Sequence, residues 1–272
     1  MHDKSMQSLG LLRRIRTLAA LPAVLCAFAL PLATAQAEAI DTILQTKVIR
    51  VAASPDFPPY GLMNKDQKIL GYDTDVAELI ARKLGVRLVQ VPAVAPTRIP
   101  FLTTDKVDVV IGSLSITEER KQAIDFSIPY GSFTFGIYGP KKIAVSRAED
   151  LAGKTIAVQR GTPSEVTLDK MAPPGTKIVR FDDTNILATA FMSGQADLMA
   201  VGANVPEMIG EKSPAAKPEM KIVFPGLPIG IGVRKGEERT VKRMNELVME
   251  LRQSGELDAL SKKWFGVPLA PL

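Results

Sequence analysis

The stretch VDVVIGSLSITEER, residues 107–120, decides the fold of this chain. It begins with apolar, mostly β-branched residues, a pattern typical of a strand buried on both faces of a parallel sheet. The run ends in glycine and serine, and a helical pattern that ends at Arg120 follows. Small anions bind at the carboxyl ends of strands in open α/β sheets, where a guanidinium can hold a carboxylate through two parallel hydrogen bonds. The stretch therefore predicts a ligand site at Arg120; a surface arginine on an amphipathic helix is the alternative.

Strands and helices alternate on both sides of this stretch, which predicts right-handed βαβ units and mainly parallel sheets. A helix is expected to begin after Gly71 and to end at Gly85, and the character of the chain changes near Gly139. The fold class is therefore α/β. We expect strands at 48–53, 86–91, 107–111, 133–138, 155–159, 178–181, 196–201, 222–224 and 229–233.

Thr162 is expected to cap a helix in the second half of the chain. Pro163 takes the first helical position, and Glu165 completes a capping box. The free N–H groups of such a helix start, that of Ser164 first among them, attract anions, although capping alone explains the same pattern. If the two halves form facing lobes, Arg120 and this helix start lie on opposite walls of one cleft, where small ligands usually bind.

Two acidic residues, Asp73 and Asp75, open the helix that follows Gly71. A carboxylate pair is one arrangement for acid–base catalysis. Acidic residues at a helix start more often serve as caps and dipole partners, however, and we predict that role for both.

The N-terminus has the pattern of an export signal. Basic residues precede an apolar stretch at 18–32, and Ala35-Gln36-Ala37 matches the small-x-small pattern of a cleavage site. Cleavage after Ala35 or after Ala39 fits the same pattern. Leu25, directly before Cys26, is a poor match to a lipoprotein signal. Residues 1–37 are therefore predicted to be a cleaved, unlipidated signal peptide.

Composition excludes several classes of function for the exported part. The only histidine is His2 and the only cysteine is Cys26, so residues 38–272 contain neither. This excludes Ser-His-Asp triads, cysteine nucleophiles and the usual zinc sites.

The chain also has no P-loop and no G-x-G-x-x-G motif, and we predict no cofactor and no metal. Four of its 34 basic and one of its 29 acidic residues lie in the signal, so the net charge of +5 falls to +2 and no nucleic-acid partner is expected.

These motifs resemble those of the bacterial extracellular solute-binding proteins of family 3, the periplasmic receptors of polar amino-acid ABC importers. The resemblance covers nearly the whole mature chain and implies a periplasmic-binding-protein-like fold. Two α/β lobes would hold a ligand cleft between them and would be joined by two hinge crossings. The first lobe would comprise 40–131 and 228–272, and the second 132–227. The matching segments are 71–77, 106–110, 115–120, 125–130, 153–155, 161–162, 193–197 and 260–266.

The resemblance assigns a carboxylate-binding role to residues of both lobes. Arg120 would pair with the α-carboxylate of the ligand, with Ser115 and Ser113 beside it. In the second lobe, Thr162 and Ser164 match the family's further contacts to the same carboxylate.

Other matching residues would surround the side chain of the ligand. Phe57 matches the aromatic residue that stacks under it. Arg98 lies in an Arg-Ile-Pro pattern that resembles members binding acidic amino acids, where the arginine faces the end of the ligand side chain. Ser54 stands where receptors for basic side chains hold an aspartate, which argues against lysine or arginine as the ligand.

The chain departs from the family pattern where the ligand ammonium is bound. The family usually offers an aspartate at the position that is Gly202 here, and a neutral site leaves a buried ammonium poorly compensated. Asn204 would substitute after a shift along the chain. Pro163 also stands where the family often donates a backbone N–H to the carboxylate.

The resemblance implies a monomeric periplasmic protein that binds a polar amino acid, acidic or amide, and delivers it to the permease of an ABC importer by hinge closure. A ligand without the α-amino group is one alternative. A second is an enzyme like the cyclohexadienyl dehydratases, with Glu165 or Glu207 as general acid; because Glu165 is expected to act in capping, we predict no enzyme. A third is a sensor domain.

Overall fold

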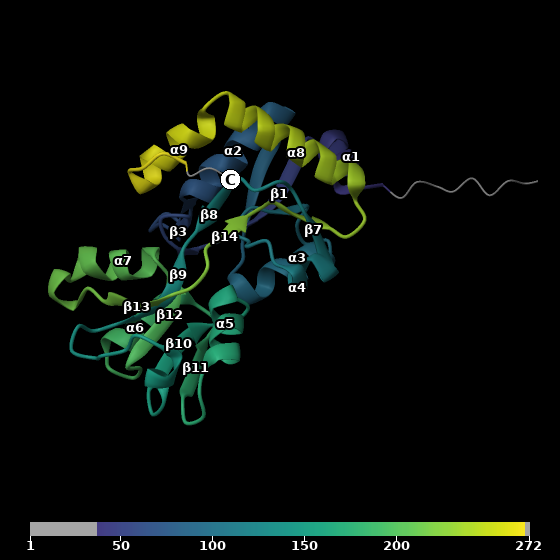
Figure 1. Ribbon diagram of the computed structural model, residues 1–272. Helices are drawn as coiled ribbons and strands as arrows, with labels where there is room; N and C mark the ends of the chain where they lie inside the picture. The colour runs from purple at the N-terminus through teal and green to yellow at the C-terminus, as the bar shows by residue number, and fades with distance from the viewer. Residues whose placement is uncertain (1–36, 270–272) are drawn as a thin grey trace, which may run out of the picture. The chain divides into compact units, whose positions relative to one another are not determined.

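The computed structural model describes residues 37–269, and its strands and helices alternate as the α/β prediction requires (Figure 1). Two five-stranded sheets form the centres of two lobes, which confirms the predicted fold class. The predicted signal peptide lies outside the described residues, apart from Ala37. No helix of the described part is long and apolar enough to cross a membrane.

The first lobe contains a sheet with the strand order β5-β1-β6-β15-β7. Strand β1 pairs in parallel with β5 and β6, and β15 runs antiparallel to β6 and β7. The strand predicted at 107–111 has only two residues in regular pairing. The strands are β1 (Val48–Ala53), β5 (Arg87–Pro92), β6 (Val109–Val110), β7 (Ile124–Phe126) and β15 (Gly232–Arg234), and a small sheet adds β2 (Asp56–Phe57), β3 (Gly61–Met63) and β4 (Ile69–Leu70). The helices are α1 (Ala39–Thr46), α2 (Tyr72–Leu84), α3 (Arg98–Thr103), α4 (Glu118–Ala123), α8 (Glu238–Gln253) and α9 (Glu256–Phe265).

The second lobe repeats the scheme with the strand order β11-β10-β12-β9-β13. Strand β10 pairs in parallel with β11 and β12, whereas β9 runs antiparallel to β12 and β13. The strands are β9 (Phe135–Gly139), β10 (Thr155–Gln159), β11 (Lys177–Phe181), β12 (Leu198–Gly202) and β13 (Glu219–Val223). The helices are α5 (Pro163–Met171), α6 (Thr184–Met192) and α7 (Asn204–Lys212).

Two strands connect the sheets. Strand β8 (Gly131–Phe133) pairs antiparallel with β14 (Leu227–Ile229), and the pair lies between the two large sheets (Figure 1). The chain therefore passes between the lobes at two adjacent places. The lobe boundaries predicted at 131 and 227 fall inside these strands and stay a prediction.

The central strands of each large sheet are buried on both faces. In β10, Ile156 and Val158 contribute to one apolar cluster while Ala157 contributes to another, because successive side chains of a strand point to opposite faces. Helix α8 adds Met244 and Leu251 to the core of the first lobe. Burial on both faces explains why central strands such as β10 and β12 are mostly apolar in sequence.

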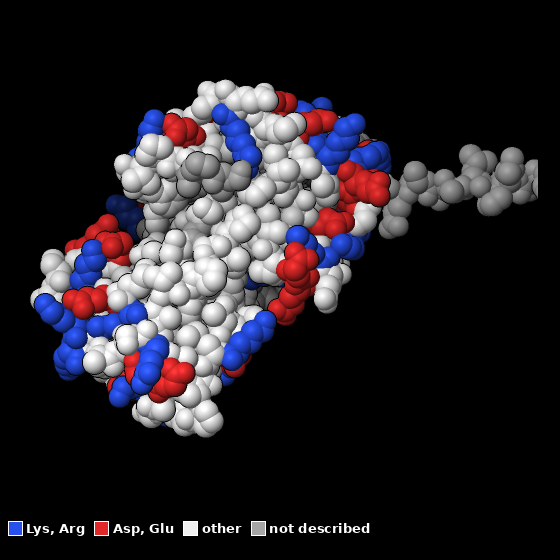
Figure 2. Space-filling model, in the orientation of Figure 1, with Lys and Arg blue, Asp and Glu red and all other residues white. Residues whose placement is uncertain are grey.

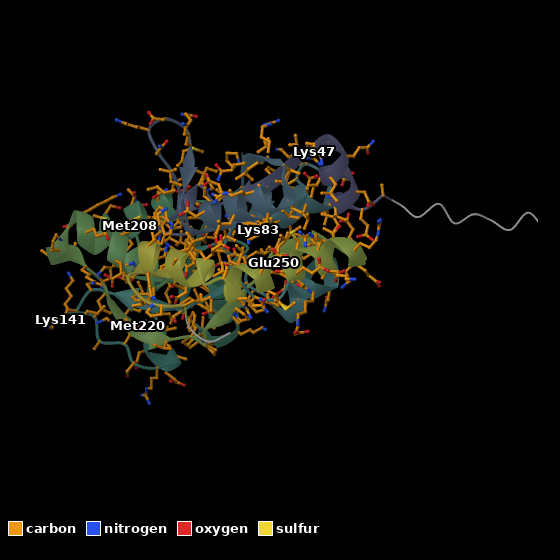
Figure 3. All side chains as sticks on the ribbon, turned by 90° about the horizontal axis from the view of Figure 1, so that it is seen from above. Lys47, Lys83, Lys141, Met208, Met220 and Glu250 are labelled. Carbon is orange, nitrogen blue, oxygen red and sulfur yellow. The ribbon has the colours of Figure 1, made fainter. Side chains whose placement is uncertain are left out.

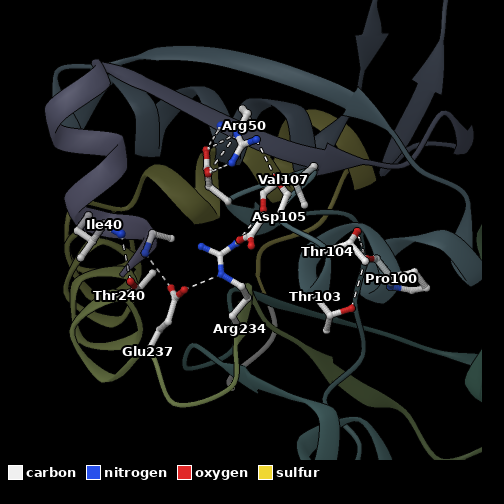
Figure 4. Close-up of polar contacts among 12 residues, drawn as sticks. Ile40, Arg50, Pro100, Thr103, Thr104, Asp105, Val107, Arg234, Glu237 and Thr240 are labelled. Atoms are coloured by element: carbon white, nitrogen blue, oxygen red, sulfur yellow. Dashed lines mark hydrogen bonds and ion pairs between the residues drawn. The ribbon is translucent and has the colours of Figure 1, made fainter. Parts of the chain in front are cut away.

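Hydrogen bonds join the beginning of the described chain to the C-terminal part of the first lobe (Figure 4). The backbone N–H of Ile40 donates to Thr240 Oγ1 at 3.2 Å, and that of Ala39 donates to Glu237 Oε2 at 3.0 Å. Arg234 Nε donates to the other oxygen of Glu237 at 2.6 Å. These contacts position α1 against α8.

Charged side chains lie mainly at the surface. On the face in Figure 2, acidic and basic side chains intermingle around a largely uncharged centre. Lys83 Nζ of α2 lies 3.9 Å from Glu250 Oε2 of α8, and Figure 3 shows the two residues side by side. Exposed pairs of this kind contribute little to stability, so apolar burial holds these helices together.

Candidate functional site

One cavity is lined by residues of both lobes. Six of the eight predicted site residues line it: Phe57, Arg98, Ser113, Arg120, Thr162 and Ser164. The remaining lining residues are Ala95, Gln159, Pro163, Thr184, Ala200, Val201, Gly202 and Val205. Arg120 and the start of α5 thus lie on the walls of the same cavity.

Arg120 places a cation in this cavity. Thr117 caps α4 by accepting a hydrogen bond from the Arg120 backbone N–H at 3.2 Å, which orients the first turn. Arg120 Nη1 donates to the Ser115 carbonyl at 3.0 Å, and Nη2 donates to the Gly161 carbonyl in the second lobe at 2.6 Å. Burial lowers the pKa of Arg120 to about 10, and the positive charge of Arg98 acts in the same direction. Arg120 therefore stays charged at neutral pH.

Ser113 is held from behind by a buried carboxylate. Its backbone lies in the left-handed region with φ of 50°, and its Oγ donates to Asp73 Oδ2 at 2.6 Å. Tyr130 OH donates to Asp73 Oδ1 at 2.8 Å, so both oxygens of this carboxylate have partners. Burial nevertheless raises the pKa of Asp73 to about 6. The trio fixes the wall of the cavity at Ser113.

Neither Asp73 nor Asp75 caps α2, so this half of the prediction is wrong, whereas both lie in its first turn as the predicted dipole role requires. Gly71 is the N-cap of α2 and makes no side-chain cap. Asp73 turns into the core instead, and Asp75 accepts a hydrogen bond from Trp264 Nε1 at 2.7 Å in α9. Both carboxylates accept hydrogen bonds from residues distant in sequence. Helix propensities consider only neighbouring residues, so they do not predict these contacts.

Arg98 is the second cation of the cavity and is only 6% exposed. Its Nε donates to the Ala93 carbonyl at 3.2 Å. Burial lowers the pKa of Arg98, while the negative charges of Asp56 and Asp73 oppose that change. Two arginines near one another make the cavity attractive to anionic groups.

The start of α5 forms the facing wall in the second lobe. Thr162 Oγ1 accepts a hydrogen bond from the Glu165 backbone N–H at 3.3 Å, and Pro163 takes the first helical position, so the predicted cap is confirmed. The capping box differs from the prediction. Glu165 Oε2 accepts from the Gly161 backbone N–H at 2.8 Å, and Oε1 accepts from Arg180 Nε at 2.7 Å.

Two predicted site residues do not line the cavity. Ser115 is fully buried, and its Oγ has no hydrogen-bond partner among the described residues. Asn204 Nδ2 donates across the lobes to the Pro58 carbonyl. Their predicted ligand contacts stay predictions.

Phe57 closes the cavity beside Gly202. Its ring stacks on Tyr60 with centroids 5.5 Å apart. A Cβ added at Gly202 would lie 2.8 Å from Phe57 Cζ and 2.6 Å from Asn204 Oδ1. In this arrangement, position 202 accepts no side chain unless its neighbours move.

Sequence reasoning missed three polar residues at this site. Asp56 is 1% exposed, and its Oδ2 accepts hydrogen bonds from Gln159 Nε2 at 3.0 Å and from the Thr184 backbone N–H at 3.1 Å. Gln159 and Thr184 line the cavity. Only one local feature of the sequence could have indicated Asp56 as a site residue. It lies directly before Phe57, in a proline-rich turn at a strand end.

The two acidic residues considered as general acids lie outside the cavity lining. Glu165 is engaged by Arg180 as described, and Glu207 Oε2 lies 2.6 Å from Lys217 Nζ on the surface. Among residues 37–269, no group of His, Cys, Asp and Glu side chains is arranged to hold a metal ion.

Comparison with known proteins identifies relatives over most of the chain. The family model of the bacterial extracellular solute-binding proteins, family 3, matches residues 49–267. The L-cystine-binding protein TcyJ from Escherichia coli is 27% identical over 229 residues, covering 84% of this chain and 86% of the relative.

Solved structures show the same architecture. A variant of the arginine-binding protein ArgBP from T. maritima matches with a TM-score of 0.78 and 35% identity, over 84% of this chain and 99% of that one. The ancestral amino acid-binding protein AncCDT-1, described as a precursor of cyclohexadienyl dehydratase, matches with a TM-score of 0.76 and 31% identity, over 83% and 99% of the two chains.

Proposed function

This chain belongs to the bacterial extracellular solute-binding proteins of family 3, and we propose that it binds a polar amino acid, acidic or amide, in the cavity between its lobes. Binding favours the closed arrangement, which delivers the ligand to the membrane permease of an ABC importer. The observation that carries this proposal is the cavity itself, because residues of both lobes line it and a charged arginine lies in its wall.

Contacts between the lobes support closure as the mechanism. Arg120 bonds to the Gly161 carbonyl, and Asn204 bonds to the Pro58 carbonyl. The strands β8 and β14 form two adjacent crossings about which the lobes would move. A ligand that touches both walls stabilises the closed state by its differential affinity for the two states.

The charges of the cavity support this ligand class. Arg120 suits the α-carboxylate, and Arg98 suits an acidic or amide side chain. Ser54 has no carboxylate to pair with a basic side chain. It is fully buried, and its hydroxyl donates to the Gly112 carbonyl at 3.2 Å. Relatives are named as binding proteins for cystine, histidine and arginine, which supports an amino acid as the ligand. A carboxylic acid without the amino group is the second candidate, favoured by the space filled beside Gly202.

Binding rather than catalysis is proposed for the site. A dehydratase needs a general acid inside the cavity. Glu165 and Glu207 are engaged by Arg180 and Lys217 instead. Neither supplies a proton donor aimed at a ligand, which supports a receptor.

The relatives and the N-terminal pattern support a periplasmic setting. Histidine-binding relatives are named as periplasmic proteins. We place this chain in the periplasm as a monomer after removal of residues 1–37, with lobes at 40–131 plus 228–272 and at 132–227.

A thermal-shift screen tests the proposed function. The mature protein is unfolded and refolded to remove carried-over ligand, then heated with each common L-amino acid, with L-cystine and with the matching acids that lack the amino group. A ligand that binds only the native state raises the melting temperature. A shift with a polar amino acid that disappears in Arg120→Ala supports the proposal, and the absence of any shift contradicts it.

A further inference from the structure

None of the described residues that line the cavity carries a carboxylate for the ammonium group of an amino acid. Position 202, where the family pattern has an aspartate, is a glycine whose Cβ position is already occupied by neighbours. Asn204, the predicted substitute, donates from its amide nitrogen to the Pro58 carbonyl, and its amide oxygen offers an ammonium only a neutral acceptor. A buried ammonium without an acceptor is strongly unfavourable, so a zwitterionic ligand requires a carboxylate elsewhere.

Asp56 has one carboxylate oxygen available for that purpose. Its Oδ2 accepts from Gln159 Nε2 and from the Thr184 backbone N–H, whereas its Oδ1 is buried and has no hydrogen-bond partner among the described residues. Both donors to Oδ2 belong to residues that line the cavity. Asp56 itself does not line the cavity, so its carboxylate lies behind the part of the wall that Gln159 and Thr184 form.

Contact between the lobes does not account for the free oxygen. One oxygen of Asp56 already makes both bonds to the second lobe, and leaving the other buried and unpaired costs free energy. Asp73, the other buried carboxylate beside the cavity, has partners on both oxygens. Asp56 is thus the carboxylate that a ligand can still engage.

The charged side chains around the cavity suit a zwitterionic ligand. Arg98 and Arg120 contribute two positive charges, and Asp56 and Asp73 contribute two negative charges. The charge of Asp56 also acts on Arg98, where it opposes the effect of burial. An amide amino acid, with one carboxylate and one ammonium, keeps the buried set balanced, whereas an acid without the amino group, or an acidic amino acid with its second carboxylate, adds one net negative charge.

We propose that Asp56 binds the α-ammonium group of the ligand through Oδ1, in place of the carboxylate that is absent at position 202. This inference rests on the proposed function of amino-acid binding. Because Oδ2 holds Gln159 and Thr184 of the second lobe, the same side chain links recognition of the ammonium to closure of the lobes.

Isothermal titration of Asp56→Asn tests this role. The asparagine oxygen can still accept from Gln159 and Thr184, but its NH2 group takes the place of Oδ1 and cannot accept from an ammonium. The probes are the amino acid that gives the largest thermal shift with the wild-type protein and the same acid with hydrogen in place of the amino group. Asp66→Asn, an exposed change in the same lobe, is the matched control.

The expected result is a selective loss. Asp56→Asn weakens binding of the amino acid by roughly 10- to 100-fold, as for a hydrogen bond to a charged group, and changes binding of the amine-free acid by less than about 3-fold. An equal loss for both probes would assign Asp56 to closure alone and overturn the inference, as would no loss for either.

The wild-type protein provides a second, independent test if the variant does not fold. A preference of at least about 10-fold for the amino acid over its amine-free counterpart supports ammonium recognition. Equal affinity for the two overturns the inference while amino-acid binding stands. Failure of the wild-type protein to bind any amino acid overturns the proposed function itself, and it does so without reference to Asp56.

Discussion

Arg120 of the first lobe donates a hydrogen bond from Nη2 to the backbone carbonyl of Gly161 in the second lobe, at 2.6 Å. The same guanidinium holds the Ser115 carbonyl through Nη1 at 3.0 Å. One side chain therefore contacts both walls of the cavity, and under the proposed function it would couple ligand binding to closure of the lobes.

Two replacements of Arg120 distinguish the contribution of its positive charge to ligand affinity from that of its planar pair of donors. Arg120→Ala is expected to abolish measurable ligand binding, since truncating one member of a buried charge pair costs about 2–5 kcal/mol. Arg120→Lys keeps the charge but loses the planar pair of donors, and we expect a loss of affinity of roughly 10- to 100-fold by calorimetry. Arg147→Lys, at an exposed arginine, is the control. Full affinity in Arg120→Lys would contradict a paired contact to the carboxylate.

The stability of the first lobe depends on the Tyr130 hydroxyl, which is linked through Asp73 to Ser113 of the cavity wall. Tyr130→Phe removes the 2.8 Å bond to Asp73 Oδ1 and leaves a fully buried oxygen without a donor. We expect a loss of about 1–3 kcal/mol in the free energy of unfolding, measured with urea. Tyr138→Phe is the matched control, because the buried Tyr138 hydroxyl has no partner among the described residues and its removal should be neutral or stabilising. Equal effects of the two changes would count against the Asp73 contact.

Asp73 makes stability depend on pH in a defined window. Burial raises the pKa of Asp73 from 3.8 to about 6, so between these values the native state holds a proton that the unfolded chain releases. The stabilising contribution is therefore complete below about pH 4 and is lost as the pH rises through about 6, by about 3 kcal/mol in total.

Urea unfolding of the wild-type protein and of Asp73→Asn at several pH values measures this contribution. The advantage of the wild-type protein over the variant should shrink from pH 4 to pH 7, because the asparagine does not titrate. A difference that stays constant over this range would show that Asp73 does not titrate there.

Asn204 is expected to act through closure. Asn204→Ala removes the bond to the Pro58 carbonyl across the lobes. We expect affinity for the ligand to fall by about 3- to 10-fold, which corresponds to one neutral hydrogen bond in the closed state. Asn64→Ala removes two bonds of the Asn64 side chain within a turn of the first lobe and should leave affinity unchanged. A loss of 100-fold or more in Asn204→Ala would indicate a direct ligand contact instead.

The structure argues against one of the three candidate signal cleavage sites, the one after Ala39. Glu38 Oε2 accepts from the Thr240 backbone N–H at 2.8 Å, and Ala39 is buried, so cleavage after Ala39 would remove a residue pair that anchors α1. We expect the exported protein to begin at Glu38, as shown by its intact mass. A mature chain that begins at Ile40 would contradict this expectation.

Several features follow from the sequence by itself. The α/β class, the cap at Thr162 and the end of α2 at Gly85 are all predictable, because hydrophobic periodicity and helix capping depend on residues within a few positions of one another. Arg120 also stands out locally, as the end of a strand, small-residue turn and helix start.

Only the tertiary structure decides which buried polar groups meet. Ser113 and Asp73 are 40 residues apart, and Asp56 and Thr184 are 128 apart. Nothing local identifies such partners, since the pairing depends on how the two sheets and their connecting strands come together. Local helix statistics therefore assign Asp73 to capping and overlook Asp56. Their roles are set by burial, because a carboxylate removed from water must find donors wherever the fold brings them.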